Sequence, residues 1–204
     1  MKLLAIMGSP RRGGNTDLLL DEFLRGFRDG GGETEKVCVG DLRVSPCLEL
    51  MECEKTGDCP IEDDMGTLAG KIYSADSIVV ASPIFFYGLP AQLKAVIDRG
   101  QAFWSQKHIL KIEPKAEREA FALLIGATKG ENLFEGSLLT LEYFFEPLGV
   151  RIAGKLLYRR IDRRGDIGKH PTALADAYRA GRDFAGGNAE CDRSPKAAVD
   201  RNQI

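Results

Sequence analysis

A short segment near the N-terminus combines the groups that bind phosphate: residues 8–16 read GSPRRGGNT. An apolar run precedes this segment and an amphipathic stretch follows it, so it is predicted to join a strand to a helix. Glycines allow a sharp turn close to an anion, the side chains of Ser9, Asn15 and Thr16 can donate hydrogen bonds, and the new helix adds free N–H groups and the positive end of its dipole. The pattern predicts a phosphate site; a glycine-rich turn without a ligand is the alternative.

The order of residues within this segment limits which class of phosphate-containing ligand it can bind. The segment lacks the Lys-Ser/Thr pair that closes the loop of nucleoside triphosphatases and the spaced glycine triplet of dinucleotide-binding motifs. A monophosphate such as that of flavin mononucleotide (FMN) fits better. Of the two neighbouring arginines, Arg11 is the candidate phosphate ligand, and Arg12 is interpreted as a solvated loop charge.

The charge and composition of the chain exclude several classes of partner. Its 204 residues include 28 Lys and Arg against 30 Asp and Glu, and the net charge of −2 provides no field suited to nucleic acid or to an anionic membrane surface. No apolar stretch is long enough to span a bilayer and no signal peptide is recognised, so a cytoplasmic location is expected. The five cysteines are interpreted as reduced thiols or metal ligands rather than as a disulfide framework.

The elements that must position the phosphate segment alternate between strands and helices. Strands are predicted at 2–7, 33–39, 77–82, 120–126 and 150–158. Helices are predicted at 16–28, 90–101, 136–145 and 172–184. This alternation predicts an α/β fold in which helices cover both faces of a doubly wound, mostly parallel sheet of five strands, giving three layers.

The remaining stretches are assigned by their composition. Residues 1–186 are expected to form one domain and residues 187–204 a poorly ordered tail. The stretches 40–65 and 104–118 are predicted to be irregular, except that Asp63 and Asp64 are expected to start and cap a helix at residue 65.

A second loop, residues 82–90 with the sequence SPIFFYGLP, follows the predicted buried strand at 77–82. Ligands of doubly wound sheets bind at the carboxyl ends of the strands, where the loops 8–16, 82–88 and 127–130 are expected to meet. Apolar and aromatic side chains bounded by Gly and Pro could cover a flat ring such as isoalloxazine, with backbone N–H groups near its polar edge. A loop packed on the core, or a dimer contact, is the alternative interpretation.

Taken together, segments 8–16 and 82–94 resemble the NADPH-dependent FMN reductase family within the flavodoxin-like fold. The resemblance spans about residues 1–160 and implies the parallel strand order 2-1-3-4-5 and bound FMN. The residues that it implies around the FMN phosphate are Ser9, Arg11, Gly14, Asn15 and Thr16. Those that it implies around the isoalloxazine are Pro83, Ile84, Phe85, Phe86, Tyr87 and Gly88, with a third contact from Thr128.

The resemblance also implies an activity. It implies that a nicotinamide cofactor, NADH or NADPH, passes a hydride to FMN, which then reduces a small-molecule acceptor such as a quinone or flavin, in a homodimer or homotetramer. Because the flavin does this chemistry, no catalytic side chain is expected, and His108 is interpreted as a solvated loop residue rather than a group above the flavin. The alternatives are an electron-transfer flavoprotein that serves a redox protein and a flavin-binding regulatory protein without turnover.

A cysteine-containing segment at 47–59 resembles the iron–sulfur flavoprotein branch of the same family. That branch has the pattern C-x2-C-x2-C followed by a fourth cysteine, whereas this chain keeps only Cys47, Cys53 and Cys59 and has Leu50 at the second position. Since a [4Fe–4S] cluster is held by four thiolates, a cluster is not expected. A loop that retained the shape of the motif and lost the metal is favoured over three-cysteine ligation of a cluster or of zinc.

Overall fold

The computed structural model describes residues 1–114 and 116–187, and all but the first residue of the tail predicted at 187–204 lies outside them. Five strands form one parallel sheet in the order β2-β1-β3-β4-β5, which confirms the predicted fold and strand order. The strands are β1 (Lys2–Met7), β2 (Glu33–Cys38), β3 (Ser77–Pro83), β4 (Arg118–Ile125) and β5 (Val150–Tyr158).

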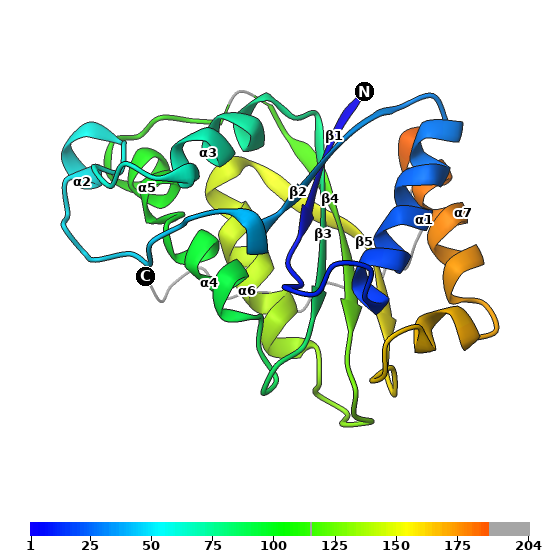
Figure 1. The fold of residues 1–204 in the computed structure, drawn as a ribbon. Helices are drawn as coiled ribbons and strands as arrows, with labels where there is room; N and C mark the ends of the chain where they lie inside the picture. The colour runs from blue at the N-terminus through cyan, green and yellow to red at the C-terminus, as the bar shows by residue number, and fades with distance from the viewer. Residues whose placement is uncertain (115, 188–204) are drawn as a thin grey trace.

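Helices cover both faces of the sheet, so the molecule has three layers (Figure 1). The helices on one face are α1 (Asn15–Asp29) and α7 (Ala173–Ala185). The other face carries α3 (Asp64–Ser74), α4 (Ala91–Asp98), α5 (Gln101–Trp104) and α6 (Glu135–Phe145). The short elements are η1 (Val39–Asp41), α2 (Cys53–Thr56), the π-helical turn η2 (Ser105–Ile109), η3 (Glu146–Leu148) and η4 (Asp166–Lys169).

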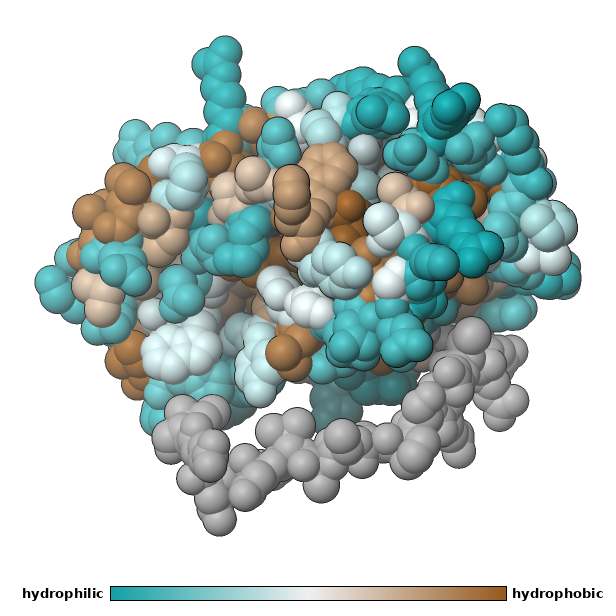
Figure 2. All heavy atoms as spheres, turned by 90° about the horizontal axis from the view of Figure 1, so that it is seen from below, coloured by the Kyte–Doolittle hydropathy of each residue, from teal (hydrophilic) through white to brown (hydrophobic). Residues whose placement is uncertain are grey.

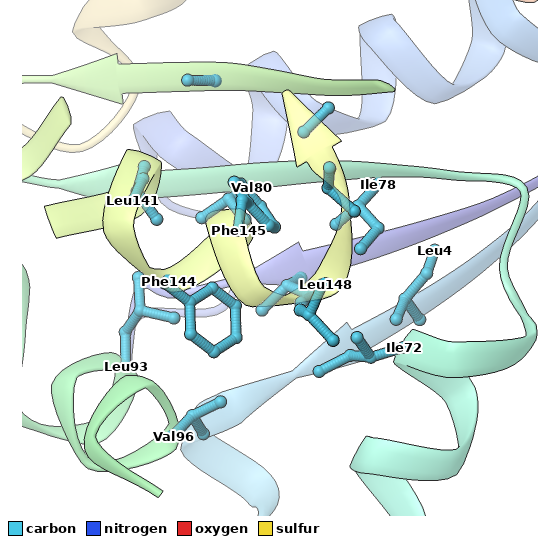
Figure 3. Close-up of a cluster of buried hydrophobic side chains, with 14 of the residues drawn as sticks. Leu4, Ile72, Ile78, Val80, Leu93, Val96, Leu141, Phe144, Phe145 and Leu148 are labelled. Carbon is cyan, nitrogen blue, oxygen red and sulfur yellow. The ribbon is translucent and has the colours of Figure 1, made fainter. Parts of the chain in front are cut away.

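Two hydrophobic clusters, one on each face of the sheet, form the core. The inner strands are buried on both faces because neighbouring residues point to opposite sides: Leu4 and Val80 belong to the cluster beneath α3, α4 and α6, whereas Leu3 and Val79 belong to the cluster beneath α1 and α7. Figure 3 shows the first cluster, in which Phe144 and other residues of α6 pack with residues of α4 and of the strands. This packing fixes the strand ends from which the loops emerge.

Two glycines determine how closely α1 and α7 approach each other. A Cβ on Gly26 would overlap the carbonyl oxygen of Tyr178, and a Cβ on Gly181 would overlap that of Phe23, so the two helix backbones are in direct contact. This contact holds α7 beside α1 and brings the chain between β5 and α7 back toward the loop after β1.

The regions predicted to be irregular contain more helix than expected. The Asp63 carboxylate accepts from the Met65 N–H at 3.0 Å, which confirms the predicted helix start. The single helix predicted at 90–101 is wrong in its extent, because α4 ends at Asp98 and α5 begins at Gln101. Gly100, a poor helix former, packs against Phe144 at this break. The stretch after α5 was predicted to be irregular, but the chain continues there into the π-helical turn η2.

Candidate functional site

A cleft opens at the carboxyl edge of the sheet, where the loops after β1, β3, β4 and β5 converge. Figure 2 views the molecule from this edge and shows hydrophobic residues near the middle of the face and mainly hydrophilic residues on the side where α1 and α7 lie in Figure 1. The residues that line the cleft are Ser9, Pro10, Arg11, Gly14, Asn15, Thr16, Pro83, Ile84, Phe85, Ile125, Ala127, Ile161 and Asp162. The cleft therefore brings together the two segments that the sequence singled out.

The loop after β1 turns sharply before α1 begins at Asn15. Gly13 has a φ of 61°, which glycine adopts without strain, and its N–H donates to the Asp17 carboxylate at 2.6 Å. The buried Ser9 hydroxyl accepts from the Arg11 N–H at 3.1 Å, so its own hydrogen is left for another acceptor. The first N–H groups of α1 have no preceding helical turn to accept from them. These groups make the cleft wall a set of hydrogen-bond donors.

Ion pairs anchor this loop outside the cleft. Burial alone would raise the pKa of Asp17, but the ion pair with Lys36 at 2.5 Å and the hydrogen bond from Gly13 lower it overall. Arg12 pairs with Asp41 at the surface, whereas Arg11 lines the cleft. The two adjacent arginines therefore have different surroundings, and of the two only Arg11 lines the cleft.

Asn15 lies in the cleft wall, but its side chain is bonded within the protein. Its Nδ2 donates to the Arg163 carbonyl at 2.9 Å, and its Oδ1 accepts from the Ile167 N–H at 3.2 Å. The side chain thus ties the start of α1 to the loop after β5. The Nδ2 group carries a second hydrogen, so the expectation that this amide donates to a phosphate stays a prediction.

The loop after β3 places only part of its apolar sequence in the cleft. Pro83, Ile84 and Phe85 line it, while Phe86 is fully exposed at the tip of a tight hairpin. Reciprocal backbone hydrogen bonds of 2.9 Å between Phe85 and Gly88 close this hairpin. Its two central residues have φ values of 49° and 61°, which are unfavourable for side chains as large as Phe and Tyr.

The amides of this loop are largely used within the protein. The Ile84 N–H donates to Ile125 at 2.9 Å, and the Phe85 and Gly88 amides donate to each other's carbonyl groups. These three N–H groups are therefore not free to donate to the polar edge of a ligand ring. Any backbone donor from this hairpin must therefore come from its tip, at residues 86 and 87.

The remaining predicted site residues lie beside the cleft rather than in its wall. Tyr87 packs against Gly130, where a Cβ would overlap the tyrosine hydroxyl, and thus connects the loops after β3 and β4. The Thr128 carbonyl accepts from the Arg160 N–H at 3.3 Å, while its neighbour Ala127 lines the cleft. The cleft wall at this point is Ala127 instead of the predicted Thr128.

A buried arginine orders the cysteine-containing segment. The Arg99 guanidinium donates to the Ser45 and Ile61 carbonyls at 3.0 and 3.1 Å and to the Asp63 carboxylate at 2.6 Å. Burial alone would raise the pKa of Asp63, but the bonds from Arg99, Ser45 and Met65 lower it overall. We call Arg99 and Asp63, with the backbone groups that they bind, the arginine clamp.

The cysteines of this segment have separate surroundings. Cys53 accepts from the Ser105 hydroxyl at 3.5 Å, Cys59 lies beside Arg99, and Leu50 is exposed. Across residues 1–114 and 116–187, no three His, Cys, Asp or Glu side chains come close enough to hold a metal ion together. The residues present do not fit a four-thiolate cluster.

Comparison with known proteins identifies the family. The model of the NADPH-dependent FMN reductase family matches residues 1–128, which include the loops after β1 and β3 and the start of the loop after β4. The chain belongs to this family. The family assignment made from segments 8–16 and 82–94 is thereby confirmed.

The curated relatives of the chain carry two kinds of name. An iron–sulfur flavoprotein of Methanocaldococcus jannaschii is 42% identical over 101 residues, which are 50% of this chain and 52% of that protein. A protein of Bacillus subtilis, provisionally named as an NAD(P)H-dependent FMN-containing oxidoreductase, is 27% identical over 88% of this chain and 96% of its own length. The match thus spans about half of the first relative and nearly all of the second.

Solved structures show the same fold. An NAD(P)H:quinone oxidoreductase from Methanothermobacter marburgensis superposes with a TM-score of 0.68 over 90% of this chain and 96% of its own, at 19% identity. At that identity the likeness establishes the fold alone. Within the described residues, every helix is too short or too polar to cross a membrane.

Several residues that line the cleft were not predicted from the sequence. Ile161 and Asp162 follow β5, and Ile125 ends β4. All parallel strands end at the same edge of the sheet, so the residues after β5 could have been included on that rule. His108 lies outside the cleft wall, and its Nε2 is 2.8 Å from the Glu146 carboxylate.

Proposed function

We propose that the chain is an FMN-dependent NAD(P)H oxidoreductase that reduces a small-molecule acceptor, with FMN bound in the cleft at the carboxyl edge of the sheet. The observation that carries this proposal is the meeting, in one cleft, of a phosphate-type loop at a helix start and an apolar wall from another strand. Family membership and the names of the relatives support it.

The phosphate end of the cleft suits a monophosphate. Ser9 and Thr16 are both buried and line the cleft, the first N–H groups of α1 lie beside them, and Arg11 adds a positive charge. Gly14 is confined between the cleft and the backbone of Arg11, whose carbonyl oxygen would lie 3.0 Å from a Cβ. A side chain at this position would crowd the loop, so glycine permits the tight turn that leads into α1.

The opposite end of the cleft suits the ring. Pro83, Ile84 and Phe85 form one apolar wall, and Ile125 and Ile161 contribute from the neighbouring strands. These side chains would exclude water from one side of the ring and hold it near the edge of the sheet, where a second molecule can reach it. When bound, FMN supplies the redox chemistry, since it accepts a hydride from a reduced nicotinamide and passes two electrons to an acceptor.

A homodimer or homotetramer is part of the proposal. A groove between α4, α5 and α6 is lined by Trp104, Leu139 and Tyr143, which are 41%, 55% and 59% exposed. Apolar side chains gathered in this way are typical of an interface. Sedimentation equilibrium of the protein and of the variant Leu139→Lys/Tyr143→Lys tests this point: we expect an oligomer that the variant shifts toward monomer, and a wild-type monomer would contradict it.

The activity is tested by adding NADPH or NADH to the FMN-loaded protein under anaerobic conditions. We expect loss of the visible absorption of oxidised flavin, followed by its recovery when a quinone is added. Failure to bind FMN, or a flavin that stays oxidised with both nicotinamides, would contradict the proposal.

A further inference from the structure

A second cavity, of about 350 Å³, lies between α3, α5 and residues 57–61, and Arg99 of the arginine clamp lines it. The described residues that line it are all different from those that line the edge cleft. Its wall is held by Gln106, whose Nε2 donates to the Gly57 carbonyl at 2.9 Å and whose Oε1 accepts from the Tyr73 hydroxyl. We call this space the clamp cavity.

Two glycines keep the clamp cavity open on the side of α3. Gly66 and Gly70 lie one helical turn apart, and beyond the helix itself a Cβ on either would meet no atom of the described residues within 4 Å. Glycine weakens a helix, and here neither a positive φ nor a close approach requires it. The cavity also contacts the rings of Tyr73 and Phe103, which pack edge to face at 5.3 Å. Such walls suit a small, flat, apolar body.

Arg99 brings one polar group to this cavity that the clamp does not use. Its side chain is 1% exposed, and its two terminal nitrogens donate within the clamp. The remaining nitrogen, Nε, is buried and has no hydrogen-bond partner in the described part of the chain. The Cys59 sulfur lies beside the guanidinium, but a thiol is a weak acceptor. Since a buried N–H without an acceptor costs free energy, Nε calls for an acceptor from outside the chain.

The charges around the cavity decide what kind of acceptor fits. The Asp63 carboxylate pairs with Arg99 at 2.6 Å, so the positive charge of the guanidinium is already balanced. Asp58 also lines the cavity and would repel an anion there. A charged acceptor would lose its hydration without gaining a free cation, whereas a neutral carbonyl oxygen loses little and satisfies the N–H.

We propose that the clamp cavity binds a small, uncharged aromatic carbonyl compound. Its oxygen accepts from the Arg99 Nε–H, and its ring lies along the open face of α3 at Gly66 and Gly70. The volume of the cavity is within the range that holds small organic ligands. This site is separate from the edge cleft, so the inference does not rest on the proposed function.

Titration of the full-length protein with acetophenone, followed in ¹H–¹⁵N NMR spectra, tests the site. We expect saturable shifts of the Gly66 and Gly70 amide signals and of the Arg99 Nε–H signal. Ethylbenzene has nearly the same shape without the oxygen, and it should bind at least about tenfold more weakly, a ratio that corresponds to ~1.4 kcal/mol. Benzoate, which carries a negative charge, should also bind more weakly than acetophenone.

The variant Gly70→Leu fills the cavity from α3. Leucine is a better helix former than glycine and would meet open space there, so the variant should fold, and it should lose the saturable shifts. The matched control is Ser74→Leu, at the exposed end of the same helix and outside the cavity wall, which should leave binding unchanged.

A second measurement uses the wild type alone. Cys59 lines the cavity, so acetophenone should slow its alkylation by iodoacetamide, followed by mass spectrometry, and should leave the rate at Cys38 unchanged. Equal affinities for acetophenone and ethylbenzene would overturn the role of Nε, and tighter binding of benzoate would overturn the choice of an uncharged ligand. Absence of saturable shifts, or binding that persists in Gly70→Leu, would overturn the site itself.

Discussion

The loop after β1 and the segment 42–63 both carry a sequence motif and both consist largely of irregular backbone, yet different interactions order them. In the first, bonds within the loop and the ion pair of Asp17 leave donors facing a cleft. In the second, the arginine clamp binds the backbone on both sides of the cysteines. A ligand site needs groups left without protein partners, whereas both terminal nitrogens of Arg99 are hydrogen-bonded to the protein.

This contrast separates a retained motif from a degenerate one. Segment 8–16 keeps Ser9, Arg11 and Thr16, which line the cleft and suit a phosphate. Segment 47–59 has Leu50 where the motif has a cysteine, and the Arg99 side chain binds the backbone on both sides of it. The first segment is expected to depend on a ligand for function, and the second on Arg99 for stability.

The largest effect is expected at the clamp. Asp63→Asn leaves the guanidinium of Arg99, whose side chain is 1% exposed, without its carboxylate, and should lower the free energy of unfolding by about 3–5 kcal/mol. Urea unfolding measures this change. Asp98→Asn, which breaks the exposed pair with Lys94, is the control and should cost less than about 1 kcal/mol.

If the two regions are independent, Asp63→Asn should also leave the affinity for FMN within about twofold at temperatures where the variant is folded. A large loss of FMN affinity would show that the clamp supports the cleft, and that the segment 42–63 and the loop after β1 are not independent.

The next largest effect concerns the phosphate end of the cleft. Thr16→Val should weaken FMN binding by about tenfold to a hundredfold, because one hydrogen bond to a charged group contributes roughly 1.5–3 kcal/mol. Flavin fluorescence titration measures the affinity. Riboflavin, which lacks the phosphate, should bind the variant and the wild type equally, and Thr140→Val on α6 serves as the matched control. Equal losses for both flavins would place the phosphate elsewhere.

A smaller effect is expected from pH. The pKa of Asp63 lies below its ordinary value of 3.8 in the folded protein, so the carboxylate stabilises the fold above that pH and the contribution disappears as the pH falls through the lowered value. The difference in unfolding free energy between wild type and Asp63→Asn should therefore be constant near neutral pH and shrink below about pH 4. A difference that persists in acid would assign the effect to packing.

The smallest effect is expected at the hairpin after β3. Phe86→Asn places a residue that tolerates positive φ at the exposed tip and should raise the unfolding free energy by up to about 1 kcal/mol. Thermal unfolding at two protein concentrations measures it. A loss of stability that grows with concentration would show that Phe86 is buried in an oligomer.

Much of the fold was predictable because the signals are local. The buried strands read as apolar runs, and the predicted 2–7 and 150–158 coincide with β1 and β5. The break between α4 and α5 was not predicted, because it lies where Gly100 packs against Phe144, a residue far away in the sequence. The side-chain bonds of Asn15 to the loop after β5 depend on how α7 packs on α1, which no local pattern reveals.

The central claim is that the edge cleft carries the redox chemistry and the cysteine segment does not. Its most direct test compares the wild type with Cys47→Ser/Cys53→Ser/Cys59→Ser, both loaded with FMN, by anaerobic reduction with NADPH and by iron and sulfide assays of the same samples. We predict no stoichiometric iron in either protein and equal rates of flavin reduction. Stoichiometric iron in the wild type, with slower electron transfer in the variant, would contradict the account.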